Sequence, residues 1–142
     1  MSFTATLKLE SMTDSEIVAR MCARQGWKCA IFEKAQRANI EWTNRQGYAA
    51  HIVVDMKHGQ VRYDTDFETM MQERLLRDRP QVSRSDSVAQ QLTDLLDVYY
   101  QEAATIVGAE RLGRTWREGK TSEGYTWIEV ADATNKLEAL VS

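Results

Sequence analysis

The stretch that most constrains the fold is Asp86 to Glu110, in which apolar residues recur every three or four positions. This spacing places them on one face of an α-helix. The apolar residues are Val88, Leu92, Leu95, Leu96, Tyr99, Ala103, Ile106 and Val107. The same stretch holds five carboxylates and no Lys or Arg, so the back of the helix is acidic. The pattern predicts a long helix, capped by Ser85 or Asp86, that covers a β-sheet.

The chain before this helix shows the two-residue alternation of half-buried strands. A first strand is predicted by the alternation of Phe3, Ala5, Leu7 and Leu9. Thr13 and Glu16 have the spacing of a capping box, which predicts a short helix that ends at Gly26. Further strands are predicted over 27–33, 38–42, 48–55 and 60–66. The short connections between them favour an antiparallel meander.

The remaining segments are shorter. Met70, Met71, Leu75 and Leu76 have helical spacing, which predicts a short helix that stops before Pro80. A last strand is predicted over 125–130, and residues 115–117 are placed to pair with it as a hairpin. Residues 131–142 have few apolar side chains to bury, so we expect a loose tail.

These elements predict a single α+β domain over residues 1–142. We expect an antiparallel β-sheet of about five to six strands, packed by one short and one long helix. The expected element order is β-α-β-β-β-(α)-α-β. The tryptophans fall in or beside predicted strands, where large aromatic side chains pack well, so all four are expected in the core.

Composition limits the expected ligands and cellular compartment of the protein. The net charge of -3 supplies no general attraction to nucleic acid. Cys22 and Cys29 lack CxxC spacing, so they predict neither a zinc site nor a disulfide framework, and a reducing cytoplasm is expected. No apolar run approaches the roughly 20 residues that span a bilayer. We therefore expect a soluble cytoplasmic protein without a cofactor and without membrane contact.

Several short motifs occur in a recognisable order: Ser2 to Thr4, Gly26-Trp27, Val61 to Phe67, Leu92-Thr93 followed by Tyr99, and Gly124 before Trp127. In these motifs the chain resembles the DUF1257 family, which includes the Ycf35 proteins of chloroplast and cyanobacterial genomes. The resemblance implies an α+β domain and an AAA-type ATPase as a possible partner. Relative to that family, residues 67–85 look like an insertion.

One group of residues offers metal ligands. His51 and Asp55 are four apart on a predicted strand, and His58 lies in the turn that follows. Imidazole and carboxylate groups suit zinc, iron or manganese. The spacing matches no known metal signature, and polar side chains on the exposed face of a sheet explain the same residues. These three residues stay weak candidates, and we expect no metal.

A basic and aromatic segment follows the long helix. It contains Arg111, Arg114, Trp116, Arg117 and Lys120. Guanidinium groups bind phosphate and an indole stacks on bases, which points to nucleic-acid or phosphate binding. The alternative is that these cations pair with the acidic helix and its negative C-terminal end. A second basic cluster consists of Arg74, Arg77, Arg79 and Arg84.

The acidic face of the long helix is the candidate surface for a protein partner, because uncompensated carboxylates dock on basic surfaces. Tyr99 and Tyr100 are adjacent and do not both face the core, so a tyrosine joins this surface. The candidate contact residues are Asp94, Asp97, Tyr100 and Glu102.

No nucleophile elbow or phosphate-binding loop occurs, and Cys22 lies on an apolar helix face that disfavours a thiolate. The leading hypothesis is a non-catalytic binding or adaptor protein that acts through protein–protein contacts. A nucleic-acid or phosphate-binding protein is the first alternative. A metal-dependent enzyme at His51 and His58 is the second.

Overall fold

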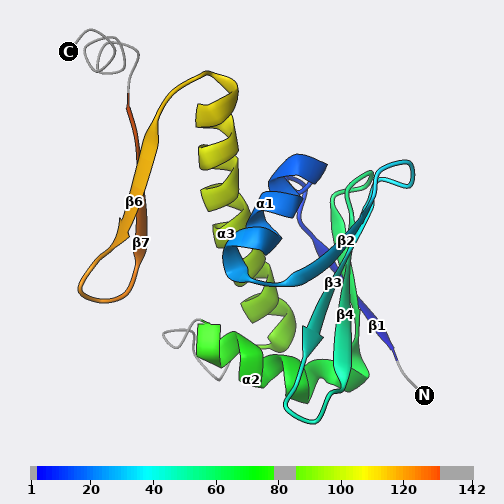
Figure 1. The fold of residues 1–142 in the computed structure, drawn as a ribbon. Coiled ribbons are helices and arrows are strands. Elements are labelled where there is room, and N and C mark those ends of the chain that lie inside the picture. The colour runs from blue at the N-terminus through cyan, green and yellow to red at the C-terminus, as the bar shows by residue number, and fades with distance from the viewer. Residues whose placement is uncertain (1–2, 79–85, 132–142) are drawn as a thin grey trace, which may run out of the picture.

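The computed structural model describes residues 3–78 and 86–131, which form an α+β fold (Figure 1). The strands of the main sheet are β1 (Thr4–Lys8), β2 (Lys28–Phe32), β3 (Arg37–Thr43), β4 (Ala49–Asp55) and β5 (Gln60–Asp64). The helices are α1 (Ser15–Gln25), a 3-10 helix η1 (Thr65–Phe67), α2 (Glu68–Asp78) and α3 (Val88–Arg111). The last two strands are β6 (Trp116–Lys120) and β7 (Thr126–Val130).

The five strands β1 to β5 form one antiparallel sheet in the order β1-β5-β4-β3-β2. The predicted meander is confirmed for β2 to β5, because each strand pairs with the next one along the chain. β1 lies beside β5, with Leu7 opposite Val61. β6 and β7 pair with each other in a separate two-stranded sheet. The predicted hairpin is therefore present, but it does not extend the main sheet.

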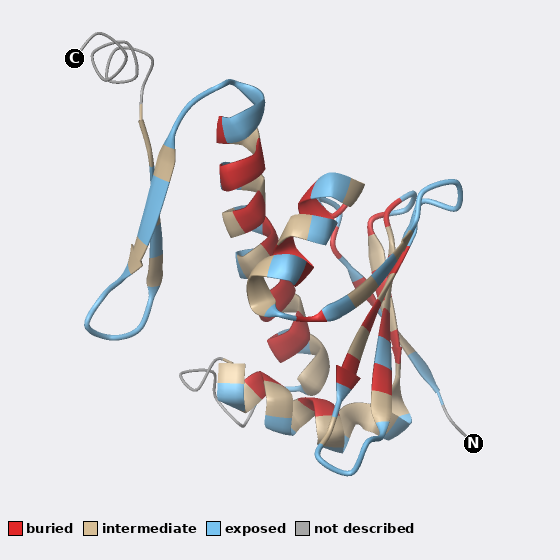
Figure 2. Cartoon of the chain, viewed as in Figure 1, coloured by how far each residue is buried: buried red, intermediate tan, exposed pale blue. Residues whose placement is uncertain are grey.

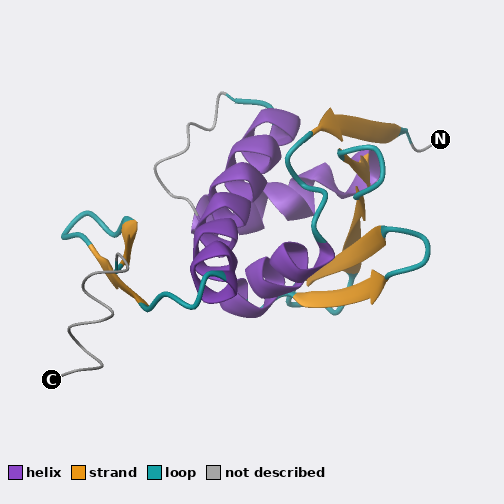
Figure 3. Ribbon diagram, turned by 90° about the horizontal axis from the view of Figure 1, so that it is seen from above, coloured by secondary structure: helices purple, strands orange, loops and turns teal. Residues whose placement is uncertain are grey.

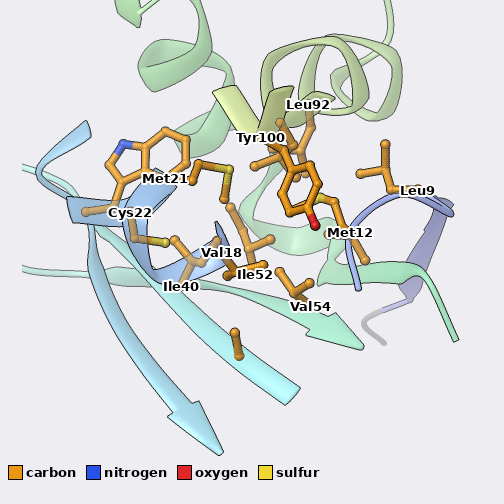
Figure 4. Packing of buried hydrophobic residues seen from close by; sticks show 14 of the residues in the cluster. Leu9, Met12, Val18, Met21, Cys22, Ile40, Ile52, Val54, Leu92 and Tyr100 are labelled. Atoms are coloured by element: carbon orange, nitrogen blue, oxygen red, sulfur yellow. The ribbon is translucent and has the colours of Figure 1, made fainter. Parts of the chain in front are cut away.

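Helices α1 and α3 pack on one face of the main sheet, as the apolar stripes predict (Figure 3). On β3 the side chains of Ala38, Ile40 and Trp42 are buried, whereas those between them are half-buried. Val18 of α1 and Ile52 of β4 are fully buried in the same cluster (Figure 4). Removing these apolar surfaces from water is the main stabilising contribution to this packing.

The start of α1 differs from the prediction. Asp14, not Thr13, caps the helix, and its carboxylate accepts hydrogen bonds from the backbone N–H groups of Glu16 and Ile17. A carboxylate satisfies these donors and also opposes the positive end of the helix dipole. The predicted end is confirmed: Gly26 has φ 71°, a left-handed conformation that glycine adopts without a steric penalty.

Helix α3 begins slightly later than predicted, at Val88, with Ser87 as the N-cap. The apolar stripe is confirmed from Leu92 to Val107, with one exchange between neighbours. Tyr100 is 4% exposed, whereas Tyr99 is half-buried. Figure 4 shows the Tyr100 ring beside Met12. Within the described part of the chain, no helix is both long and apolar enough to cross a membrane.

Two predicted segments lie partly beyond the described residues. The short helix predicted before Pro80 is present as α2, and η1 precedes it directly. The rest of the 67–85 segment, residues 79–85, lies outside the described residues, as does the predicted tail from residue 132 onwards.

The tryptophans divide into two environments. Trp27 and Trp42 are in the core, as predicted. The prediction is wrong for Trp127, which is 41% exposed on the hairpin, and Trp116 is only half-buried. A two-stranded sheet has too little surface to bury large rings on both faces, which explains why much of the hairpin is exposed in Figure 2.

Candidate functional site

The acidic face of α3 is smaller than the sequence suggests. Asp97 is exposed, and Asp94 is half-buried and accepts a hydrogen bond of 2.9 Å from Gln90 Nε2. Tyr100 does not belong to this face, because its buried hydroxyl accepts a 3.3 Å hydrogen bond from the backbone N–H of Asp14. Its assignment to a partner surface is therefore corrected: its ring packs in the core.

The Glu102 side chain is also largely buried. Its carboxylate lies 3.7 Å from the Arg24 guanidinium, and its side chain is 15% exposed. Burial raises the pKa of the Glu102 carboxyl, and the nearby Arg24 charge opposes this rise. Of the four predicted contact residues, only Asp94 and Asp97 present carboxylates outside the packing between α1 and α3.

Much of the basic segment after α3 pairs within the molecule. Arg111 lies 3.0 Å from Asp14 and 2.8 Å from Glu16 at the start of α1. Arg117 pairs with Glu129 across the hairpin at 2.8 Å. The indole Nε1 of Trp116 donates a 3.4 Å hydrogen bond to Glu110. These contacts with carboxylates engage Arg111, Trp116 and Arg117, which the phosphate-binding hypothesis requires to be free to bind a ligand.

Two of the predicted phosphate ligands remain. Arg114 and Lys120 are exposed, and neither side chain forms a hydrogen bond or ion pair with another described residue. Arg111 is neutralised within the molecule, but by Asp14 and Glu16 of α1. The alternative interpretation, in which these cations pair with the acidic long helix, therefore does not describe this residue.

The three metal candidates form local pairs. The Nδ1 atom of His58 lies 2.8 Å from Asp55 Oδ2 in the β4–β5 turn, and this hydrogen bond lowers the pKa of the Asp55 carboxyl. His51 faces Glu41 on the neighbouring strand, with 3.9 Å between His51 Nε2 and Glu41 Oε1. The described residues contain no group of three or more His, Cys, Asp or Glu side chains that could hold a metal ion.

The cysteine on α1 is a poor nucleophile. Cys22 is buried, and both a hydrogen bond with Cys29 and the burial raise the pKa of its thiol. A thiol with a raised pKa supplies little thiolate at neutral pH.

A concave surface lies between α2 and the turn that joins β3 to β4. It is a groove of about 830 Å³. We call it the α2 groove and define it by six of its lining residues, namely Trp42, Arg45, Tyr48, Phe67, Arg74 and Arg77. Its volume falls within the range of roughly 300–1,000 Å³ typical of ligand-binding pockets.

Trp42 forms the buried part of the groove. Its ring is 3% exposed and packs edge-on against Trp27, with 5.3 Å between the ring centroids. The guanidinium of Arg74 lies 5.8 Å above the Trp42 ring, close enough for a cation–π interaction. The Nε1 donor of Trp42 is buried and has no hydrogen-bond partner among the described residues.

The β3–β4 turn holds the exposed side of the groove in a defined conformation. Asn44 Oδ1 accepts hydrogen bonds from the backbone N–H groups of Gln46 (3.0 Å) and Tyr48 (2.9 Å). The backbone N–H of Asn44 donates in turn to the carbonyl of Tyr48, at 2.9 Å. Arg45 and Tyr48 are therefore presented by an ordered turn, although Tyr48 is 68% exposed.

Two arginines of the groove have weak or no internal partners. Arg45 forms no side-chain hydrogen bond or ion pair with another described residue. Arg77 is 64% exposed, and its guanidinium lies 3.9 Å from Asp78. Arg74 is half-buried and lies 3.4 Å from the same carboxylate. The groove thus offers exposed guanidinium groups beside aromatic side chains.

Sequence reasoning did not find this site. It grouped Arg74 and Arg77 in a basic cluster and treated the residues between the strands at 38–42 and 48–55 only as a short connection. The available signal was a hairpin turn that carries Arg45 beside two aromatic residues. The sequence does not show that this turn lies close to α2.

No family model, curated protein or solved structure matches this chain. The resemblance to DUF1257 therefore stays a prediction.

Proposed function

We propose that this protein is a non-catalytic binding protein that holds a segment of a partner protein in the α2 groove. The observation that carries the proposal is the convergence of three arginines and three aromatic side chains on one open groove. Tyr, Trp and Arg are the residue types that dominate the binding energy of protein interfaces. Such side chains bury large areas and retain polar groups that fix the orientation of a partner.

The groove suits a chain segment better than an enclosed small molecule. Arg45, Tyr48 and Arg77 along it are exposed, so a ligand there remains open to solvent on one side. Small-molecule sites usually bury most of the ligand surface. An extended segment needs only one face covered and leaves the groove at its ends.

The resemblance to DUF1257 supports an AAA-type ATPase as one partner class. The half-buried Asp94 and the exposed Asp97 on α3 are a second candidate contact. Both remain proposals, and the groove and the acidic face are separable by mutation.

The test is a selection from a random peptide library on the purified protein. We expect selected peptides to lose affinity by about tenfold or more for Tyr48→Ala, because the aromatic ring at the mouth of the groove is removed. Tyr125→Ala is the matched control, since Tyr125 is also an exposed tyrosine but lies beside β7. Asp97→Asn tests the acidic face of α3.

The proposal would be overturned by either of two results. One is a library that yields no peptide with measurable affinity. The other is a set of peptides that bind Tyr48→Ala as well as they bind the wild type. Circular dichroism and thermal melting of each variant confirm that a loss of affinity is not a loss of folding.

A further inference from the structure

We infer that the segment held in the α2 groove is acidic, with a carboxylate side chain next to apolar ones. This inference rests on the proposed function and adds the chemistry of the partner. It is drawn from the charges and apolar side chains that line the groove.

The cations of the groove are incompletely neutralised. Arg45 has no ion pair with a described residue, and the 3.9 Å separation of Arg77 from Asp78 is too long for a hydrogen bond. By contrast, Arg24 and Arg111 elsewhere in the molecule each approach a carboxylate to within 2.8 Å. A guanidinium binds a carboxylate through a two-pronged hydrogen bond, so a carboxylate fits this free donor set.

The two sides of the groove present their incompletely neutralised guanidinium groups from different elements. Arg45 comes from the β3–β4 turn and Arg77 from the last turn of α2. A segment lying along the groove passes both of these elements. We therefore expect the segment to make one acidic contact on each side of the groove.

The apolar part of the groove lies with these cations. Phe67 and Met70 are half-buried, and Tyr48 is the most exposed aromatic residue of the lining. Methionine adapts its shape to different side chains, and an aromatic ring covers a large apolar area. The segment is therefore expected to place an apolar side chain between its acidic ones.

The carboxylates of the lining decide between a protein and a nucleic acid. Asp66 and Glu73 also line the groove, so its formal charge is only slightly positive. A nucleic acid carries a negative charge on every nucleotide and meets these carboxylates with repulsion. A peptide places its charges at separate positions, with neutral residues between them. An acidic protein segment is the occupant that fits this mixed lining.

The experiment compares the peptides selected by two forms of the protein from one library. We expect peptides selected by the wild type to be enriched in Asp and Glu relative to the unselected library. The double variant Arg45→Gln, Arg77→Gln should lose this enrichment and bind the wild-type peptides about tenfold or more weakly. Arg117→Gln is the matched control, because it removes an arginine from the hairpin.

Calorimetry then separates the contribution of charge to the affinity from that of shape. The best acidic peptide is titrated beside a version in which each Glu or Asp is replaced by Gln or Asn, and beside an oligothymidine. We expect the acidic peptide to bind most tightly and to weaken as salt is added.

Each outcome has a defined meaning. Peptides that depend on Tyr48 but show no acidic enrichment overturn this inference and leave the proposed function standing. Equal affinity for the acidic and neutralised peptides does the same. Tighter binding of the oligothymidine, lost in the double arginine variant, replaces the protein segment with a nucleic acid. Peptides that bind Tyr48→Ala and the wild type equally overturn both proposals.

Discussion

The guanidinium of Arg24, near the end of α1, binds the carboxylate of Glu118 on β6 through two hydrogen bonds of 3.1 and 2.7 Å. The Arg24 side chain is 15% exposed and also lies 3.7 Å from Glu102 of α3. One arginine thus connects α1 and α3 to the β6–β7 hairpin. The hairpin is otherwise a two-stranded sheet, which has little stability of its own in water.

Replacing this arginine is expected to destabilise the protein. Arg24→Gln should lower the free energy of unfolding by about 1–2 kcal/mol, because the largely buried Glu102 and the exposed Glu118 both lose their cation. Denaturant unfolding measures this change. Arg117→Gln is the control, since its pair with Glu129 is exposed and should contribute no more than about 0.5 kcal/mol. Equal losses in the two variants would contradict the role assigned to Arg24.

The contribution of Glu118 should depend on pH. Its hydrogen bond with Arg24 lowers the pKa of the Glu118 carboxyl below its ordinary value of 4.5. The stabilisation is therefore present above that pH and is lost as the pH falls through the lowered pKa. We expect the stability difference between the wild type and Glu118→Gln to be constant from about pH 7 to about pH 5 and to close in more acid solution. A difference that grows on acidification would exclude this pairing.

The contribution of Glu102 to stability should depend on pH in the opposite direction. Burial raises the pKa of its carboxyl above 4.5, so the folded state takes up a proton before the unfolded state does as the pH falls. The stability of the wild type should then increase, relative to Glu102→Gln, as the pH falls from neutral through the raised pKa. Thermal melting of both proteins across this range measures the difference. Parallel curves would show that Glu102 is not desolvated.

Gly59 should tolerate no side chain. Its φ is +62°, and a Cβ atom there would lie 2.8 Å from the Cα of Glu10. Gly59→Ala is expected to lower the free energy of unfolding by about 1–3 kcal/mol, because the backbone conformation and the close contact both become strained. The control is Gly108→Ala in α3, where nothing lies within 4 Å of an added Cβ. That variant should gain about 0.5–1 kcal/mol in the same unfolding experiment.

On one face of the hairpin, the Trp127 ring packs over Gly119. A Cβ atom at Gly119 would lie 2.5 Å from Cζ2 of Trp127, which is paired opposite it. Because Trp127 is exposed, Gly119→Ala should displace the ring at a cost of no more than about 1 kcal/mol. The indole resonance of Trp127 in an NMR spectrum should move toward its value in the unfolded protein. An unchanged resonance would show that the ring does not lie over the glycine.

The sequence predicted the elements and their faces more completely than the site. The strand alternation around Ile40 and the helical spacing from Leu92 to Val107 were read correctly, because side-chain direction follows the local backbone repeat. The helical spacing predicts that Tyr99 is buried, but Tyr100 is the buried tyrosine, which shows the limit of prediction from a local repeat. Both tyrosines sit near the border of the apolar stripe, and packing of the Tyr100 hydroxyl against the Asp14 backbone decides which one is buried.

The same limit applies to the charged residues. Residue counts showed an acidic α3 and a basic segment after it, and charge pairing was one of the two readings offered. Only the fold shows that Arg111 pairs with Asp14 on α1, whereas Arg45 pairs with no carboxylate among the described residues. Ion pairs between distant segments depend on where those segments meet, and no local repeat encodes that.

By itself, therefore, the sequence determined the α+β class, the apolar faces of α1 and α3 and the antiparallel strands of the meander. Each of these follows from a repeat of two or about 3.6 residues along one stretch of chain. The tertiary structure alone decided that the β3–β4 turn lies beside α2, which brings Arg45 and Arg77 to one groove. That juxtaposition comes from the packing of segments about thirty residues apart, and packing depends on all the surfaces that meet in the core.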